Sequence, residues 1–364
     1  MLGAGAVGGW LAAGLARAGH EVGVLARGAT LAALRRDGLV LLEGERRQAL
    51  PLRATDDPAA LRGADFLLLG LNSPLTKCRC SVPNTACSAD YAGCGPTSCG
   101  TECRIRFCQR AVKGHDLPGA LPAIAALLGE RTLVLTAQNG IPWWFFQGGF
   151  GGPASGLVLE SVDPGGALAR ALPAERVVGA VVHAASRVEA PGVVRLVKAD
   201  RLLLGSPLGA PGGGVAALVS AFRAGGVPAE AVPDIRAEIW AKLWGNSSMN
   251  PLSALCRADA AAMLDEPGVR GLVLAMMREM AEIGARIDLP LAADPEARIA
   301  VTRRLGAFRT SMLQDLEAGR PLEAGPLLGA LVELAGHLGL PAPQLRGVHG
   351  LLRLLARGLP PPRG

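Results

Sequence analysis

The sequence predicts an α/β domain followed by an all-α domain. A glycine-rich turn at the start of the chain leads into a helix and then a strand. Short apolar runs without alternation, typical of buried parallel strands, recur in the first half. From Asp234 onward the apolar spacing is helical. We therefore expect a Rossmann-like domain over residues 1–233, a helical domain over 234–358 and a proline-rich tail over 359–364.

Length and composition limit the class of protein. The chain has 364 residues, enough for about two domains at roughly 150 residues each. Half of the residues are hydrophobic and 19% are charged, which excludes disorder throughout. A net charge of +6 over this length gives no indication of nucleic acid binding. No apolar run is long enough for a membrane helix, and residues 1–16 lack the basic start of a signal peptide. We expect a cytoplasmic protein.

The N-terminal turn reads Gly3-Ala-Gly5-Ala6-Val7-Gly8. In a dinucleotide-binding turn the first glycine permits the tight bend, the second admits a pyrophosphate and the third lets the helix pack on the sheet. The amides at the start of that helix then face the phosphates. An ordinary buried helix in a chain rich in glycine and alanine is the alternative explanation.

Arg27 follows the predicted strand over residues 21–26, where an NAD-binding protein would carry a carboxylate for the ribose. A guanidinium there suits a 2′-phosphate, so NADPH is the expected cofactor rather than NADH. The alternative is an ordinary surface arginine. Only Met1 and Leu2 precede the turn, so either the true start lies upstream or the sheet lacks its middle strand. We favour an upstream start.

A cysteine-rich segment interrupts the first domain. Seven of the eight cysteines lie between Cys78 and Cys108, in text unlike the rest of the chain. No C-x-x-C pair occurs there, so no metal site is expected, and the odd number argues against a closed disulfide set. We interpret residues 72–112 as an insertion or an untrimmed piece of a gene model, with a disordered surface loop or a small module as alternatives. Cys256, in a helical stretch, is expected to be a small buried residue.

The segment begins where a buried strand over residues 65–71 ends. Removing residues 72–112 joins that strand directly to Lys113, which would then face the cofactor at the carboxyl edge of the sheet. The next predicted strand, over residues 132–136, is followed by Gln138-Asn139-Gly140.

In the helical half, Lys242, Asn246 and Asn250 are spaced by four residues and share one helix face. An exposed face with an ordinary Glu238–Lys242 ion pair is the alternative. Apolar neighbours flank this stripe, which favours the wall of a cleft. Further on, Ser311 and Glu323 stand on either side of a Gly-Arg-Pro break, where a surface hydroxyl and a first-turn carboxylate would be unremarkable.

Together, the glycine turn, Gln138-Asn-Gly, the Lys242/Asn246/Asn250 helix and Ser311-Met-Leu-Gln-Asp leading to Gly-Arg and Glu323 resemble the ketopantoate reductase family. The resemblance implies a Rossmann domain joined to a helical domain like the C-terminal domain of 6-phosphogluconate dehydrogenase, with the active site between them. It also implies that Lys242 is the general acid and that Glu323 holds the substrate or orients that lysine. The remaining implied site residues are Asn139, Asn246, Asn250 and Ser311 for the substrate, and Gly3, Gly5, Ala6, Val7, Gly8, Arg27, Lys113 and Asn139 for NADPH.

These residue types suit ketone reduction. Hydride addition leaves negative charge on oxygen, which an ammonium stabilises and then protonates. Burial would lower the pKa of Lys242 and a nearby Glu323 would raise it, and the sequence does not decide between them. Leu322-Glu-Ala-Gly and the Trp143-Trp144 pair depart from the family, so we expect a 2-oxo acid, with ketopantoate as the first choice. The sequence leaves alternatives open. The protein could bind NADPH without catalysis, reduce another small 2-oxo acid, or be a 3-hydroxy acid or imine reductase of similar build. A homodimer is also open.

Overall fold

The computed structural model describes residues 5–70, 106–111, 117–209, 212–291 and 294–359. The strands are β1 (Glu21–Leu25), β2 (Leu39–Glu43), β3 (Arg46–Leu50), β4 (Arg53–Thr55), β5 (Phe66–Gly70), β6 (Arg106–Ala111), β7 (Leu133–Ala137), β8 (Val177–Ala190), β9 (Val193–Gly205) and β10 (Ala229–Ala231). The α-helices are α1 (Ala6–Arg17), α2 (Gly28–Asp37), α3 (Leu117–Leu127), α4 (Ala167–Ala171), α5 (Gly213–Ala224), α6 (Ile235–Cys256), α7 (Ala260–Asp265), α8 (Pro267–Arg286), α9 (Pro295–Arg304), α10 (Ser311–Glu317), α11 (Ala330–His337) and α12 (Pro343–Arg357). A π-helical turn, η6 (Gly325–Gly329), precedes α11.

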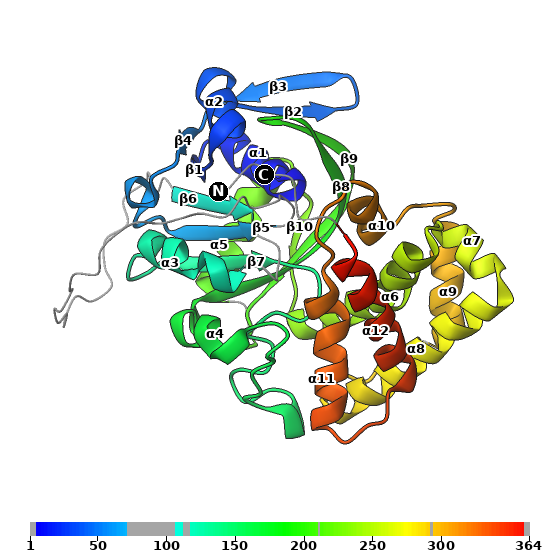
Figure 1. The fold of residues 1–364 in the computed structure, drawn as a ribbon. Helices are drawn as coiled ribbons and strands as arrows, with labels where there is room; N and C mark the ends of the chain where they lie inside the picture. Colours follow the sequence, from blue (N-terminus) through cyan, green and yellow to red (C-terminus); the bar gives the residue numbers. More distant parts are fainter. Residues whose placement is uncertain (1–4, 71–105, 112–116, 210–211, 292–293, 360–364) are drawn as a thin grey trace.

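The strands form a single sheet in the order β3-β2-β9-β8-β7-β5-β6-β1-β4, with β10 paired to β9 (Figure 1). The run from β8 to β4 is parallel, while β8 and β9 form a long antiparallel pair. The helices from α6 to α12 gather beside the sheet, as predicted from the change of pattern at Asp234. The fold is therefore an α/β domain with a helical C-terminal region.

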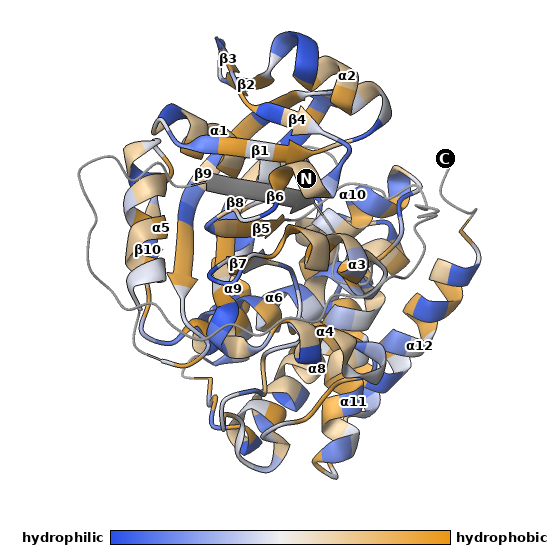
Figure 2. Cartoon of the chain, turned by 90° about the vertical axis from the view of Figure 1, so that its left-hand side faces the viewer, coloured by the Kyte–Doolittle hydropathy of each residue, from blue (hydrophilic) through white to orange (hydrophobic). Residues whose placement is uncertain are grey.

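Both faces of the sheet are covered, which explains the apolar runs without alternation. Along β5, Phe66 and Leu68 belong to the hydrophobic cluster that includes α1 and α5. Leu67 and Leu69 point the other way, into the cluster that includes α3 and the helical half. Figure 2 shows the hydrophobic colour along much of β1 and β5.

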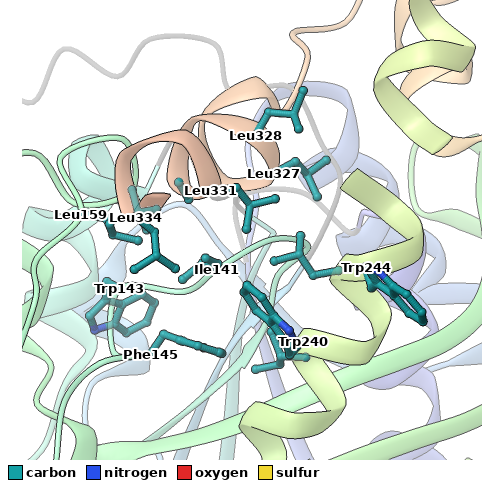
Figure 3. Packing of buried hydrophobic residues seen from close by; sticks show 14 of the residues in the cluster. Ile141, Trp143, Phe145, Leu159, Trp240, Trp244, Leu327, Leu328, Leu331 and Leu334 are labelled. Carbon is teal, nitrogen blue, oxygen red and sulfur yellow. The ribbon is translucent and has the colours of Figure 1, made fainter. Parts of the chain in front are cut away.

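The second cluster joins the sheet to the helical half. Side chains of Ile141 and Phe145, from the segment after β7, lie between α6 and the helical segment that carries Leu331 and Leu334 (Figure 3). Trp240 of α6 is 1% exposed within this cluster. The segment following β7 is therefore held by the helices that follow it much later in the chain.

The middle of the sheet differs from the prediction. Strand β6 lies between β1 and β5 and pairs with both in parallel, Glu21 with Arg106 and Gly70 with Ala111. The alternative that the sheet lacks its middle strand is therefore wrong. The last residues of the segment interpreted as an insertion fill this position, whereas its residues 72–105 lie outside the described part of the chain.

Cys256 was expected to be buried, and that prediction was wrong: the residue is exposed. It is the last residue of α6, and the following Arg257 has a positive φ of 52°, so the chain turns away there. Among the described residues, no helix combines the length and hydrophobicity needed to span a membrane.

Candidate active site

Helix α6 supplies the first element of the site, and two sets of hydrogen bonds fix its start. Asp234 caps the helix by accepting hydrogen bonds from the amides of Arg236 and Ala237. The buried Arg236 guanidinium donates to the backbone carbonyls of Phe145 and Gln147, both at 2.7 Å, and also to that of Pro207. These bonds tie the start of α6 to the segment after β7.

Lys242 lies two turns into this helix, and its Nζ donates to the carbonyl oxygen of Val182 in β8 at 2.9 Å. Burial lowers its pKa to about 8, while the carboxylate of Glu323 acts in the opposite direction. Burial therefore outweighs the carboxylate, which answers the question that the sequence left open. The amine is protonated at neutral pH yet close to giving up its proton.

Glu323 is 5% exposed and lies just before η6. Its Oε2 accepts a hydrogen bond of 3.5 Å from the Asn139 Nδ2. The preceding turn is folded back on α10, because the Arg320 side chain donates to the buried Asp315 carboxylate at 2.6 Å and its amide donates to the Asp315 carbonyl. Gly319, with φ of 62°, permits that turn. The Gly-Arg pair thus positions the glutamate.

Asn250 and Ser311 meet about two turns beyond Lys242 along α6. The buried Asn250 side chain donates to the Ser311 Oγ at 3.4 Å. Thr310, not Ser311, caps α10, since its Oγ1 accepts from the Leu313 amide. The Ser311 hydroxyl is consequently not engaged in capping the helix on which it lies.

A small pocket lies between these elements. Residues of the segment after β7, of α6 and of β8 line it. Its lining residues are Gln138, Asn139, Gly140, Val181, Ile239, Lys242, Leu243 and Asn246. The structure thus brings Lys242, Asn139 and Asn246 to one pocket, with Glu323 bonded to Asn139.

The predicted phosphate site lies at the start of α1. No side chain caps this helix at Gly5, and its first turn, which includes Ala6, Val7 and Gly8, carries no acidic residue. Arg27 lies two residues after the end of β1, where it is exposed and precedes α2 as its N-cap residue. Amides at a helix start and a guanidinium are donors that suit the phosphates of a dinucleotide, so the described residues fit a nicotinamide dinucleotide. Gly3 and Lys113 lie outside the described residues.

Sequence reasoning missed three features of the pocket. The Val182 carbonyl that holds Lys242 belongs to a strand with no distinguishing motif. The contact between Gly140 and Pro326 is also long-range: a Cβ on Gly140 would lie 2.3 Å from the Pro326 oxygen. The Gln138 amide was quoted as part of a motif but given no role, although its place next to Asn139 was a usable signal.

Comparison with known proteins gives concordant results. The model of the ketopantoate reductase PanE/ApbA family matches residues 1–76, and that of its C-terminal domain matches residues 234–356. A 2-dehydropantoate 2-reductase of Mesorhizobium japonicum is 38% identical over 98% of this chain and 97% of its own. A solved structure from Ralstonia solanacearum MolK2, described as a ketopantoate reductase, has a TM-score of 0.82 at 40% identity, covering 98% of this chain and 96% of its own. The PanE/ApbA family ketopantoate reductase of Ralstonia eutropha JMP134 gives 0.72 at 27% identity, covering 98% and 97%.

Proposed function

Because the chain belongs to the ketopantoate reductase family of oxidoreductases, we propose that it reduces a 2-oxo acid to the 2-hydroxy acid with NADPH, ketopantoate to pantoate being the first candidate. The observation that supports this most directly is the buried Lys242 amine, with its lowered pKa, at the wall of a pocket with amide side chains. The proposal places the enzyme in the cytoplasm, in pantothenate biosynthesis.

Lys242 is the general acid of this proposal. An ammonium has three donors, and the bond to Val182 uses one of them, so others are available to a ketone oxygen. When bound, the reduced nicotinamide supplies a hydride to the ketone carbon. The ammonium stabilises the negative charge that develops on oxygen, and its proton ends on the new hydroxyl. A pKa of about 8 keeps the lysine charged at neutral pH and makes it a better acid than an exposed lysine.

The other side chains bind and orient. Asn246 lines the pocket one turn from Lys242, and neutral amides bind a carboxylate and a hydroxyl without competing for the lysine proton. Asn250 and Ser311 extend the polar wall by a further turn. Glu323 fixes Asn139 and keeps the pKa of Lys242 from falling further. Each of these roles is a proposal for this chain.

For the cofactor, we propose that Gly3, Gly5, Ala6, Val7 and Gly8 contact the pyrophosphate and that Arg27 contacts the 2′-phosphate. Lys113 and Asn139 complete the proposed set. The supporting observation is the uncapped start of α1 followed by an exposed arginine after β1. If Arg27 recognises the 2′-phosphate, Arg27→Ala should weaken NADPH binding strongly and leave NADH binding nearly unchanged, as measured by dissociation constants.

The function is tested by mixing the purified protein with NADPH and a panel of 2-oxo acids that includes ketopantoate, and following NADPH oxidation and the hydroxy acid product. Turnover of ketopantoate with the highest kcat/KM supports the full proposal. Preference for another 2-oxo acid would keep the reaction and change the substrate. NADPH binding without turnover on the whole panel would favour the non-catalytic alternative and contradict the proposal.

A further inference from the structure

Gln138 is the first residue after β7 and lines the same pocket as Lys242. Its Nε2 is buried, and it has no hydrogen-bond partner among the residues that the structure describes. A buried amide nitrogen without an acceptor is destabilising, and buried polar groups in folded proteins nearly always have a partner. The geometry therefore points to an acceptor supplied by whatever occupies the pocket.

Contacts of the residues that follow Gln138 hold the turn on which it lies. Gly140 has φ of 87° and packs directly against Pro326, and the amide of Ile141 donates to the Pro326 carbonyl at 3.0 Å. On the other side of the turn, Asn139 is bonded to Glu323. The turn is thus fixed at Asn139 and at Gly140–Ile141, which keeps the Gln138 backbone at the pocket.

The composition of the pocket identifies the kind of acceptor. Its polar side chains can all donate, since they are one ammonium and three carboxamides, and its other side chains are apolar: Val181, Ile239 and Leu243. No Asp or Glu is among the residues that line the pocket, so an anionic ligand meets no repulsion from a lining side chain. Such a pocket favours a small molecule that carries several acceptor oxygens and an aliphatic part.

We propose that the Gln138 carboxamide donates a hydrogen bond to the carboxylate of the bound 2-oxo acid, and thereby makes the enzyme selective for acids over neutral ketones. This inference rests on the proposed function, in which Lys242 takes the ketone oxygen. In a 2-oxo acid the carboxylate is attached directly to the ketone carbon. A second donor in the same pocket therefore suits the carboxylate, while the ketone oxygen stays with the ammonium.

The test compares wild type with Gln138→Met, which keeps the length of the side chain and removes the donor, and with Gln138→Glu, which adds a like charge. We expect KM for ketopantoate to rise about ten- to hundredfold in Gln138→Met, the range for a lost hydrogen bond to a charged group, with kcat changed much less. Gln138→Glu should raise KM further. Gln314→Met, on the exposed side of α10, is the matched control and should leave both constants unchanged.

Two further measurements distinguish carboxylate binding from a structural or cofactor role. With the methyl ester of ketopantoate, which lacks the charge, Gln138→Met should lose little, so that the preference for acid over ester falls by about the same factor as KM rises. In Gln138→Met, the dissociation constant of oxamate, an unreactive analogue of a 2-oxo acid, should be larger than in wild type when both are measured in the presence of NADPH. The dissociation constant of NADPH itself should not change.

An unchanged KM and oxamate affinity in Gln138→Met would overturn the inference while leaving the proposed function intact. Weakened NADPH binding with an unchanged KM would also overturn it, because the amide would then serve the cofactor. Equal losses on acid and ester would indicate a structural role and overturn it as well. A wild-type enzyme that turns over no 2-oxo acid would overturn both proposals.

Discussion

Helix α6 and strand β6 are both central to the molecule, yet they are specified in opposite ways. Local signals agree with the place of α6: Asp234 caps it, its apolar residues have helical spacing, and it packs on α8, α10 and α12. Strand β6 occupies the middle of the sheet between β1 and β5. Its sequence, Arg-Phe-Cys-Gln-Arg-Ala, lacks the apolar run that its neighbours show.

The comparison indicates which elements hold the pocket and which hold the edge of the sheet next to it. The pocket depends on α6, β8 and the segment after β7, whose local sequence and long-range contacts support each other. The proposed cofactor edge depends on the region around β6, where local pattern and position in the sheet conflict, and such conflicts weaken a fold. We therefore expect the elements that form the pocket to be more stable than the centre of the sheet.

The largest effect is expected at the pocket. Lys242→Met should lower kcat by about 10²- to 10⁴-fold, because the variant cannot stabilise and protonate the developing oxyanion. Its folded structure and NADPH dissociation constant should stay near wild type, since Met fills a similar volume. Steady-state kinetics and cofactor titration provide the measurement.

Lys198→Met is the control for this substitution. Lys198 is exposed and pairs with Asp200 at 2.9 Å on the β8–β9 pair, so its loss should leave kcat unchanged. Retained turnover in Lys242→Met would show that the lysine has no part in the mechanism. Helix α6 would then not supply the general acid.

The second effect concerns the bond between α6 and the segment after β7. Arg236→Met should lower the free energy of unfolding by about 3 kcal/mol, because three backbone carbonyls lose a charged donor in a buried place. Denaturant unfolding measures this loss. The exposed Arg35→Met should change it by less than about 0.5 kcal/mol. Equal effects from the two variants would show that Arg236 does not anchor the helix.

Much of the fold and the polar side of the site could be predicted from the sequence, because those signals are local. Spacing by four places Lys242, Asn246 and Asn250 on one helix face, and the end of an apolar run places Asn139 at the edge of the sheet. The roles of these residues stay predictions. Their relative placement in the structure agrees with a shared pocket, apart from Asn250, which lies one turn away beside Ser311.

The rest could not be predicted because it depends on contacts between distant segments. The Val182 carbonyl meets Lys242 across 60 residues, and the pKa of that lysine reflects a balance between burial and Glu323. The position of β6 is a matter of which segment fills a gap in the sheet, and no periodicity in its six residues indicates it. Exposure of Cys256 similarly follows from where α6 ends.

Hydrogen exchange measures the comparison of α6 with β6 directly. We expect the backbone amides of Phe107 to Gln109 in β6 to exchange about tenfold faster or more than those of Leu243 to Ser248, relative to their intrinsic rates. The reason is the conflict between the sequence of β6 and its central position. Peptide-level mass spectrometry resolves the two segments. Equal protection would mean that the sheet centre is as stable as the helix, and would contradict our account of the difference.

The smallest effect, and the finest test of the pocket, is the pH dependence of catalysis. In the proposed mechanism reduction requires the Lys242 ammonium, whose pKa of about 8 lies below the ordinary value, so kcat/KM should fall as the pH rises above about 8. Glu323 raises this pKa, and Glu323→Gln removes that charge with little change of shape. The lysine then loses its proton more readily, so the decline should begin at lower pH than in wild type, by less than about one unit. A decline at unchanged or higher pH would show that the carboxylate does not act on the lysine, whereas a fall in kcat/KM that is the same at every pH would leave Glu323 a role only in holding Asn139 or the substrate.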